Sequence, residues 1–506
     1  MKLKAILFLS LLTAFALSFN QFGAGLPNSA SASETLAHSS SQSAADLEAK
    51  IRRVENGLRP STVIKGQTEG LNIAERMKYY KAPGVSIAVI NNGRIEWARG
   101  YGVVEAGDPR PITSETLFQA GSISKPVAAM AALRLVEQGK LDLDEDVNRK
   151  LKSWKVPEND FTKEKKVTLR GILSHSAGLT VHGFPGYAAD AEMPTLVQVL
   201  NGEKPANTPA IRVDLVPGTK WRYSGGGYTV MQQMLIDVTG KSFPQLTREM
   251  VLGPAGMKHS TYEQPLPKAT AVSAATAHMN GTPVKGRFHT YPEMAAAGLW
   301  TTPSDLALLA IEIQQEIAGR SSKVLSTKMA NQMVTEQIGN YGLGPSVQGP
   351  GQALRFSHGG VDEGFEAFWI AFAHTGQGAV VMVNANRGVQ LAQEIVRSIA
   401  REYGWPDQPP SKERAVAKVD PKIYEAYVGE YNVMGAKVTI SSERGHLFIV
   451  APPLGPERVE LYPESETKFF LLEQEVNITF AKDEQGQVKE MVIQPGNQTL
   501  KGIKVK

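Results

Sequence analysis

The chain has 506 residues, a formal net charge of +4 and no cysteine. The absence of thiols excludes a disulfide framework, thiol catalysis and lipid attachment through an N-terminal cysteine. Lysine and arginine are scattered along the chain rather than interleaved with aromatic residues, so we expect no nucleic-acid partner.

Residues 1–32 have the composition of an export signal peptide. Lys2 and Lys4 precede an apolar stretch that ends near Phe19, and Ala30 to Ala32 supply a small-residue cleavage site. An N-terminal membrane anchor is the alternative, but the apolar stretch is short for a span. We therefore expect a secreted protein, extracellular or associated with the cell wall, with no stable membrane span once the signal is removed.

The remaining chain, about 470 residues, is long enough for two or three domains. Residues 33–50 are rich in serine and alanine and predict a flexible leader. Residues 51–404 form the main domain, residues 405–420 a proline-rich linker, and residues 421–506 a C-terminal domain of different character.

The first regular structure expected in the main domain is a β-hairpin. Gly84 to Ile90 and Arg94 to Gly102 are strand-like runs on either side of an Asn-Asn-Gly turn. Asn-Gly favours such a turn because both residues tolerate a positive φ.

A Ser-x-x-Lys pattern follows the hairpin and opens the apolar run from Val127 to Val136. If a helix begins at about Ser122, the three-residue spacing places its hydroxyl and the Lys125 amine on one face. A desolvated lysine loses its charge more readily and can serve as a base, while the helix N-terminus favours negative charge near the serine. A second copy, Ser465 to Lys468, lies in strand-like sequence where no helix aligns the two side chains.

Residues 167–179 predict a buried helix that ends at a glycine turn. His175 and His182 lie in or near this segment, but neither belongs to a pattern with metal-ligand spacing. We interpret His175 as a structural hydrogen-bonding residue and expect no metal ion.

Tyr223 and Ser224 stand on a glycine-rich loop before the helical run from Thr229 to Val238. Such a loop can project hydroxyl groups into a cleft, because irregular backbone often carries binding side chains. An ordinary helix-capping loop with an anchoring aromatic residue is the alternative, and this segment alone does not exclude it.

The rest of the main domain contains a small-residue packing segment, a helix start and further strands. The strands complete one sheet with the N-terminal hairpin around a helical middle. The expected elements are packing residues at 295–301, a helix from Thr302 or Ser304, a strand ending at His358-Gly359-Gly360, strands at 365–372 and 379–383, and a helix at 391–403.

Eight short alternating runs follow the linker and predict a small antiparallel β-barrel. These runs are residues 427–431, 437–440, 447–450, 459–462, 468–472, 477–481, 488–493 and 499–505. The segment resembles the lipocalin-like domains appended to several proteins that share the features described next.

Three motifs occur in a fixed order: Ser122 to Lys125, Tyr223 to Gly225, and His358 to Gly360. Together they resemble the serine β-lactamase and penicillin-binding-protein superfamily, most of all its class C-like branch of carboxypeptidases, D-peptidases and esterases. The resemblance covers about residues 73–403. It implies an α/β (α+β) fold with an antiparallel sheet flanked by helices, plus a helical subdomain, ahead of the small barrel.

The resemblance also implies roles for individual residues. Ser122 is the nucleophile, Lys125 is its paired base, and Tyr223 passes protons between the nucleophile and the leaving group. Backbone N–H groups of Ser122 and Val361 form the oxyanion hole.

Residues Ser224, His358, Gly360 and Val361 are expected to contact the substrate, and no cofactor is expected. The substrates implied are a small peptide, an ester or a β-lactam, with peptidoglycan as a further partner.

Two positions depart from the superfamily pattern. Gly225 replaces the asparagine that grips an acyl side chain, and His358 replaces a lysine. Histidine is only conditionally charged at neutral pH, so carboxylate binding should be weaker and pH-dependent. These departures favour a secreted serine hydrolase of amide or ester bonds, including D-amino-acid substrates.

A β-lactamase and a non-catalytic penicillin- or peptidoglycan-binding protein are the alternatives. An α/β-hydrolase is disfavoured because the sequence lacks a Gly-x-Ser-x-Gly motif.

Overall fold

The structure, a computed structural model, describes residues 44–505 except 68, 408–409, 452–454 and 497. The predicted signal peptide and most of the predicted leader lie outside these residues. Residues 44–55 are helical, whereas we expected a flexible leader up to residue 50. Alanine, leucine, glutamate and lysine occupy most positions from 44 to 50, and their high helix propensity explains the difference. No helix in the described part of the chain is both long and apolar enough to span a bilayer.

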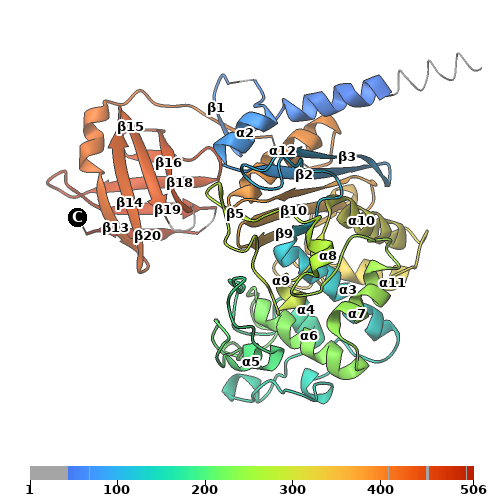
Figure 1. The fold of residues 1–506 in the computed structure, drawn as a ribbon. Coiled ribbons are helices and arrows are strands. Elements are labelled where there is room, and N and C mark those ends of the chain that lie inside the picture. The colour runs from blue at the N-terminus through green and yellow to red at the C-terminus, as the bar shows by residue number, and fades with distance from the viewer. Residues whose placement is uncertain (1–43, 68, 408–409, 452–454, 497, 506) are drawn as a thin grey trace, which may run out of the picture. The chain divides into compact units, whose positions relative to one another are not determined.

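A six-stranded antiparallel sheet forms the frame of the main domain (Figure 1). In the middle of this sheet, residues 84–91 pair with residues 378–383, so strands from both ends of the domain sequence complete one sheet, as predicted. In spatial order the strands are β3 (Arg94–Gly102), β2 (Gly84–Asn91), β11 (Gly378–Val383), β10 (Phe365–Phe372), β9 (Arg355–Asp362) and β8 (Ser346–Gln348). The predicted hairpin is confirmed, with positive φ at Asn92 and Gly93 in its turn.

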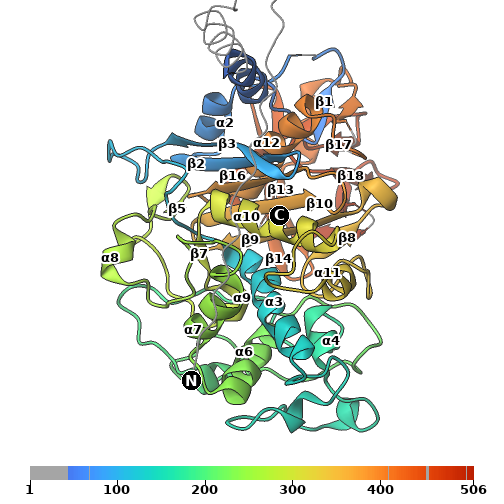
Figure 2. The ribbon, with the colours of Figure 1, turned by 90° about the vertical axis from the view of Figure 1, so that its right-hand side faces the viewer.

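Helices cover both faces of this sheet. α12 (Gly388–Glu402) packs on β10 and β11, and α10 (Pro303–Ile317) packs on the opposite face (Figure 2). α12 buries an apolar stripe at 391, 395 and 399, spaced by four residues, which is the spacing of one helix face. α10 begins where predicted, because the Thr302 side chain accepts a hydrogen bond from the Asp305 N–H as an N-cap.

The helical subdomain lies between the two sequence halves of the sheet. Its central helix is α3 (Ser124–Glu137), whose residues from 127 to 133 are completely buried. Around it lie α4 (Leu169–Leu173), α5 (Leu196–Asn201), α6 (Gly225–Thr239), α7 (Phe243–Thr247), α8 (Lys268–Ala271), α9 (Met294–Ala297) and α11 (Thr327–Met333). A helix buried on all sides holds its N-terminus in a fixed place, which matters for the site described below.

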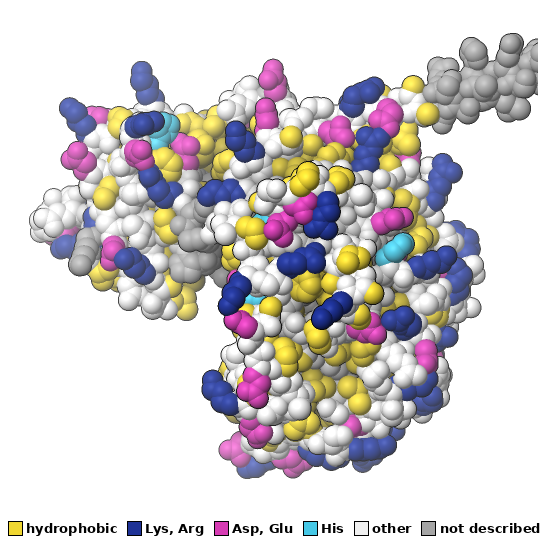
Figure 3. Space-filling view, viewed as in Figure 1, with side chains coloured by type: hydrophobic (Ala, Val, Ile, Leu, Met, Phe, Trp, Pro, Cys, Tyr) yellow, Lys and Arg dark blue, Asp and Glu magenta, His cyan; other side chains and the backbone are white. Residues whose placement is uncertain are grey.

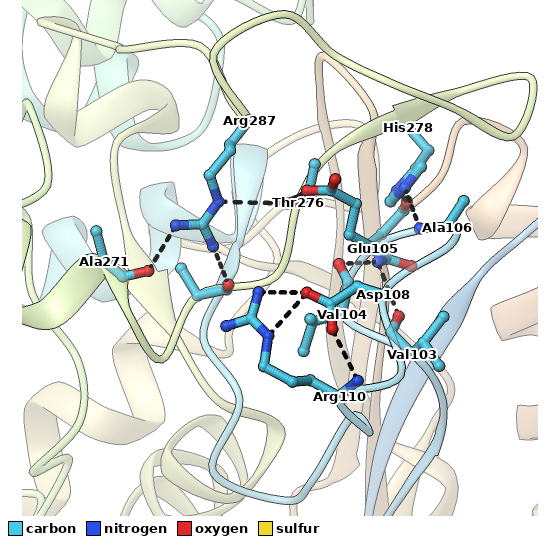
Figure 4. Close-up of polar contacts among 12 residues, drawn as sticks. Val103, Val104, Glu105, Ala106, Asp108, Arg110, Ala271, Thr276, His278 and Arg287 are labelled. Carbon is cyan, nitrogen blue, oxygen red and sulfur yellow. Dashed lines mark hydrogen bonds and ion pairs between the residues drawn. The ribbon is translucent and has the colours of Figure 1, made fainter.

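A polar network fixes the segment that leads toward α9 (Figure 4). The Arg287 guanidinium donates to the carbonyl oxygens of Ala271 and Ala274 and to the Thr276 hydroxyl. Thr276 in turn donates to Glu105 Oε2 at 2.7 Å. This segment crosses the loop after β3, so its hydrogen bonds join two distant parts of the sequence.

The C-terminal domain is a closed antiparallel barrel of eight strands, as predicted. Aromatic rings fill part of its interior, and the rings of Tyr427 and Phe480 stack with centroids 4.3 Å apart. The strands are β13 (Gly429–Val433), β14 (Ala436–Glu443), β15 (His446–Ala451), β16 (Gly455–Pro463), β17 (Lys468–Phe470), β18 (Val476–Lys482), β19 (Val488–Pro495) and β20 (Leu500–Lys504).

Backbone hydrogen bonds join the linker and the barrel to the main domain. β1 (Thr62–Ile64) pairs in parallel with β12 (Lys412–Arg414), and the Thr62 N–H donates to the Leu472 carbonyl oxygen at 2.9 Å. On the face shown in Figure 3, lysine and arginine side chains are interspersed with aspartate and glutamate, as the small net charge leads one to expect.

Candidate active site

Ser122 and Lys125 lie together at the start of the buried helix. The Lys125 Nζ donates a hydrogen bond to the Ser122 Oγ across 2.8 Å. Ser122 occupies a 3₁₀ turn, Gly121–Ile123, and the α-helix proper begins at Ser124. The predicted proximity of hydroxyl and amine is therefore confirmed, with a tighter turn at the serine than a regular helix would give.

Ser124 holds this turn in place through hydrogen bonds. Its hydroxyl donates to the Gly121 carbonyl at 2.6 Å and accepts from the Leu299 N–H at 3.0 Å. Its own carbonyl accepts from the buried Tyr262 hydroxyl at 2.6 Å. The nucleophile thus stands on backbone that is fixed from two sides.

A second acceptor fixes the Lys125 amine. The Nζ also donates to the Ala296 carbonyl oxygen at 2.8 Å, at the end of α9. Gln232 of α6 positions α9, since its amide donates to the Pro292 carbonyl and accepts from the Ala295 N–H. Three helices therefore meet at the amine and aim it at the serine.

Burial changes the acid–base behaviour of Lys125. Its side chain is almost completely buried, and desolvation lowers its pKa from 10.5 to about 7, while the Asp362 carboxyl group opposes the shift. A lysine with a pKa near 7 is substantially unprotonated at neutral pH. The amine can therefore accept the Ser122 proton.

Tyr223 also reaches the nucleophile. Burial raises its pKa, and a hydrogen bond with the Ser122 side chain opposes that shift. The Lys125 Nζ lies 4.9 Å from the centroid of the Tyr223 ring. Because the phenol stays protonated at neutral pH, it can relay a proton to a leaving group, and the base is the lysine.

His358 lies beside this group but carries no positive charge. Burial and the nearby Lys125 lower the pKa of His358 to about 3, and its Nδ1–H donates to the Gly359 carbonyl at 2.6 Å. We expected a charge that appears conditionally at neutral pH. The structure corrects this expectation, because desolvation keeps the imidazole neutral far below pH 7.

Glycines let strand β9 approach the start of α3. A Cβ at Gly360 would lie 1.9 Å from the Ala120 carbonyl oxygen, and a Cβ at Gly121 would lie 2.4 Å from the Val361 nitrogen. Neither position accommodates a side chain without moving backbone. This contact brings the Val361 backbone to the serine turn, and Val361 itself is 59% exposed in the cleft.

We expected Ser224 to contact the substrate, but this residue does not line the cleft. Its hydroxyl accepts from the Gly227 N–H at 2.9 Å and donates to the Thr180 carbonyl at 2.8 Å, so it caps α6. Its backbone N–H donates to the His175 Nδ1 at 3.1 Å. The structural role expected for His175 is thus confirmed, and this histidine supports the Tyr223 loop.

The residues of the site line a cleft with a volume of about 770 Å³. Sequence reasoning missed several of them: Trp221 and Tyr341, whose ring centroids lie 5.3 Å apart, as well as Phe184 and Asp362, which ends β9. Asp362 was open to prediction, because it continues the alternation of His358 and Gly360 along the strand.

The remaining lining residues are Ser122, Lys125, His182, Gly183, Pro185, Tyr223, Ala296, Ala297, His358, Gly359, Val361 and Val389. A Cβ at Gly225 would lie 3.0 Å from a Phe184 ring carbon. Phe184 therefore occupies the space that a larger residue 225 would need. Within the described residues, no group of three or more His, Asp or Glu side chains is arranged to hold a metal ion.

Comparisons with known proteins find similar sequences among curated proteins. Penicillin-binding protein 4* of Bacillus subtilis is 24% identical over 430 residues, which cover 79% of this chain and 90% of that protein. Protein flp of Staphylococcus aureus is 24% identical over 316 residues, 60% of each chain. The unguisins hydrolase ungD of Aspergillus violaceofuscus is 28% identical over 258 residues, 47% of this chain and 43% of its own.

Solved structures share the fold. The octameric penicillin-binding protein homologue from Pyrococcus abyssi has a TM-score of 0.57 at 22% identity, covering 85% of this chain and 98% of its own. The β-lactamase/D-alanine carboxypeptidase from Yersinia pestis has a TM-score of 0.51 at 18% identity, covering 65% of this chain and 97% of its own.

Two family matches divide the chain in the same way as the fold. Residues 413–503 match a domain of unknown function, DUF3471, and residues 71–403 match the β-lactamase family. The second match spans most of the chain and contains the Ser122–Lys125 pair, and it shows that the protein belongs to the β-lactamase family of serine hydrolases.

Proposed function

We propose that the protein is an exported serine hydrolase that forms an acyl-enzyme on Ser122 with small ester or amide substrates, including D-amino-acid derivatives. The observation that carries this proposal is the 2.8 Å hydrogen bond between the Lys125 Nζ and the Ser122 Oγ. The pKa of about 7 for Lys125 supports its role as the base. Export rests on the signal-like sequence of residues 1–32.

Acylation begins when the Ser122 Oγ attacks the substrate carbonyl carbon and the Lys125 amine takes the hydroxyl proton. Backbone N–H groups of Ser122 and Val361 are the donors for the oxyanion. The bond to the leaving group then breaks, and the leaving group receives a proton through the Tyr223 hydroxyl. The product of this half-reaction is an ester on Ser122.

Deacylation repeats the proton transfers with water in place of the serine. The Lys125 and Tyr223 pair accepts a proton from the attacking water, and the ester bond to Ser122 breaks as its oxygen recovers the proton. The acid product then leaves, and the serine hydroxyl and lysine amine return to their starting states.

The chemistry of the cleft favours neutral leaving groups. Apart from Lys125, the described lining residues include no lysine or arginine, and His358 is neutral. Aromatic rings surround Tyr223, whose ring centroid lies 4.2 Å from that of His175 and 6.4 Å from that of Tyr341. Recognition of a substrate carboxylate needs a cation, so we infer that esters and amides with uncharged leaving groups react better than carboxypeptidase substrates or β-lactams.

Labelling of the active serine tests the proposed chemistry. A fluorophosphonate should modify the wild type at Ser122, and the matched Ser122→Ala variant should stay unmodified. A fluorescent penicillin should label Ser122 weakly and turn over slowly. Efficient penicillin turnover would favour a β-lactamase, stable penicillin labelling without ester hydrolysis a non-catalytic binding protein, and no label from either reagent would reject the proposal.

Replacement of His358 tests the inference about leaving groups. His358→Lys introduces a cation near Tyr223, so it should raise kcat/KM for a D-Ala-D-Ala peptide relative to a neutral ester. His358→Gln, which stays uncharged, is the control. A wild type that prefers the peptide over the ester would contradict the inference.

A further inference from the structure

Asp362 is a buried acid in the lining of the cleft, and no described side chain is paired with it. It is 5% exposed and belongs to the lining of the cleft, and neither of its carboxyl oxygens has a hydrogen-bond partner among the described residues. The Gly121 backbone N–H lies close enough to this carboxyl group to lower its pKa, against the larger effect of burial. An unpaired buried polar group is costly, and such groups call for an explanation.

The surroundings of Asp362 supply another acid rather than a cation. Glu293 is completely buried, neither of its carboxyl oxygens has a partner among the described residues, and it acts on Asp362 electrostatically. Burial raises the pKa of Glu293 to about 8 and that of Asp362 well above its ordinary value. Lys125 is the nearby cationic group, but it must lose its charge to act as a base. Burial therefore keeps both acids protonated in the empty cleft, and a cationic group of a bound substrate would favour the charged form of Asp362.

Strand geometry places Asp362 and His358 on opposite sides of the serine turn. His358, Gly360 and Asp362 alternate along β9 and are buried on the same face. Gly360 packs against the Ala120 carbonyl at the start of the serine turn. His358 and Asp362 therefore flank that turn at about 13 Å from each other, four strand residues apart.

The position of the proton donor indicates which part of the substrate lies on each side of the serine turn. A leaving group must take its proton from Tyr223, whose ring lies 6.1 Å from that of His358, so the leaving group occupies the His358 side. The acyl part of the substrate then extends past Val361 toward Asp362.

We propose that Asp362 binds a protonated primary amine in the acyl part of the substrate, so that the enzyme acts on aminoacyl esters or amides with an unblocked amine. This inference rests on the proposed function, because only acylation of Ser122 puts the acyl group beside Asp362. Binding releases the carboxyl proton to solvent and forms an ammonium–carboxylate pair, and no covalent bond changes. Asp362 lies two strand residues, about 7 Å, from Gly360, which favours an α-amine over the distal amine of a long side chain.

The test compares alanine benzyl ester with N-acetylalanine benzyl ester, each as D and L isomers. Rates are divided by the hydroxide-catalysed rate of each ester, because acetylation changes intrinsic reactivity. The wild type should prefer the free amine by at least about tenfold in kcat/KM, since a site built to bind a polar group rejects substrates that lack it. Asp362→Asn and Asp362→Thr should each lower this ratio to below about twofold.

Glu363→Gln is the matched control, because Glu363 is the adjacent acid and does not line the cleft. It should keep the wild-type ratio, and thermal melting of each variant verifies folding. A wild-type ratio near one, or a high ratio that survives in a folded Asp362 variant, overturns the inference. Hydrolysis of p-nitrophenyl butyrate and fluorophosphonate labelling report on Ser122 separately, so their loss in the wild type would instead overturn the proposed function.

Discussion

Lys125 determines how the reactivity of Ser122 depends on pH. Burial lowers the pKa of this amine to about 7, and the base must be unprotonated to take the serine proton. We therefore expect kcat/KM for p-nitrophenyl butyrate to rise with pH, with a midpoint near 7. Rates measured from pH 5 to pH 9 check this expectation.

Lys125→Arg provides the comparison, because a guanidinium remains charged throughout this range. This variant should be inactive at every pH tested. A wild-type profile without an inflection between pH 5.5 and pH 8.5 would show that another group is the base.

The burial of Lys125 also lowers the free energy of unfolding, because the folded state disfavours the charged amine. Its pKa is about 7 in the folded protein and 10.5 when exposed, so between these values the unfolded state binds more protons and the wild type gains stability as pH rises. Lys125→Met should therefore stabilise the fold most below pH 7, by roughly 1–3 kcal/mol after loss of two hydrogen bonds. The gain should disappear above pH 10.5. Denaturant unfolding at pH 6 and pH 10.5 measures both values, and an equal gain at the two pH values would contradict the account.

The sequence predicts the positions of some site residues but not the charge or pairing of others. Ser122, Lys125 and Tyr223 meet as predicted, because their motifs have fixed local geometry. The charge of His358 and the isolation of Asp362 depend on desolvation by residues distant in sequence. Motif spacing contains no information on that burial, so these two features emerge only from the packed structure.

Strand β9 and helix α3 meet at glycine, and this contact builds the site. Gly360→Ala would put its Cβ 1.9 Å from the Ala120 carbonyl oxygen and force β9 away from the serine turn. We expect a loss of about a hundredfold in kcat/KM, because displacement of catalytic groups by an ångström has effects of that size. Steady-state kinetics and thermal melting measure the two consequences.

Gly359→Ala is the matched control, since its Cβ would find its nearest neighbour at 4.0 Å. This variant should melt close to the wild type. If Gly360→Ala kept normal kinetics, the close approach of β9 would not be required for catalysis.

Secondary structure was most predictable where local chemistry is strong. The Asn-Gly turn marks the hairpin, short apolar runs mark β10 and β11, and alternating runs mark the eight barrel strands, whereas the short strand β8 was not predicted. α9 is different, because its alanines predict only a packing segment. Its position depends on contacts from distant residues: the Gln232 amide donates to the Pro292 carbonyl before it, and the Lys125 amine donates to the Ala296 carbonyl within it. The helix at residues 44–55 was not predicted, because the serine-rich sequence before it masked its helix propensity.

No described residue of the barrel lines the cleft, and the last lining residue in the sequence is Val389. A chain that ends at Pro410 should therefore keep kcat/KM for p-nitrophenyl butyrate within about threefold, as expected for separate sites. It should melt at a lower temperature, because it loses the bond from Thr62 to Leu472 and the one from Tyr79 to Glu473. A tenfold loss of kcat/KM in a folded truncated chain would show instead that the barrel shapes the cleft.

The most direct measurement of the acyl-enzyme is acid-quench mass spectrometry with p-nitrophenyl butyrate. The wild type, mixed with ester and quenched within the first turnover, should carry one butyryl group on the peptide that contains Ser122. Lys125→Ala should show no such adduct at the same time, although Ser122 is still present. A butyryl group on another residue, or equal acylation of Lys125→Ala, would contradict the assignment of Ser122 as nucleophile and Lys125 as base.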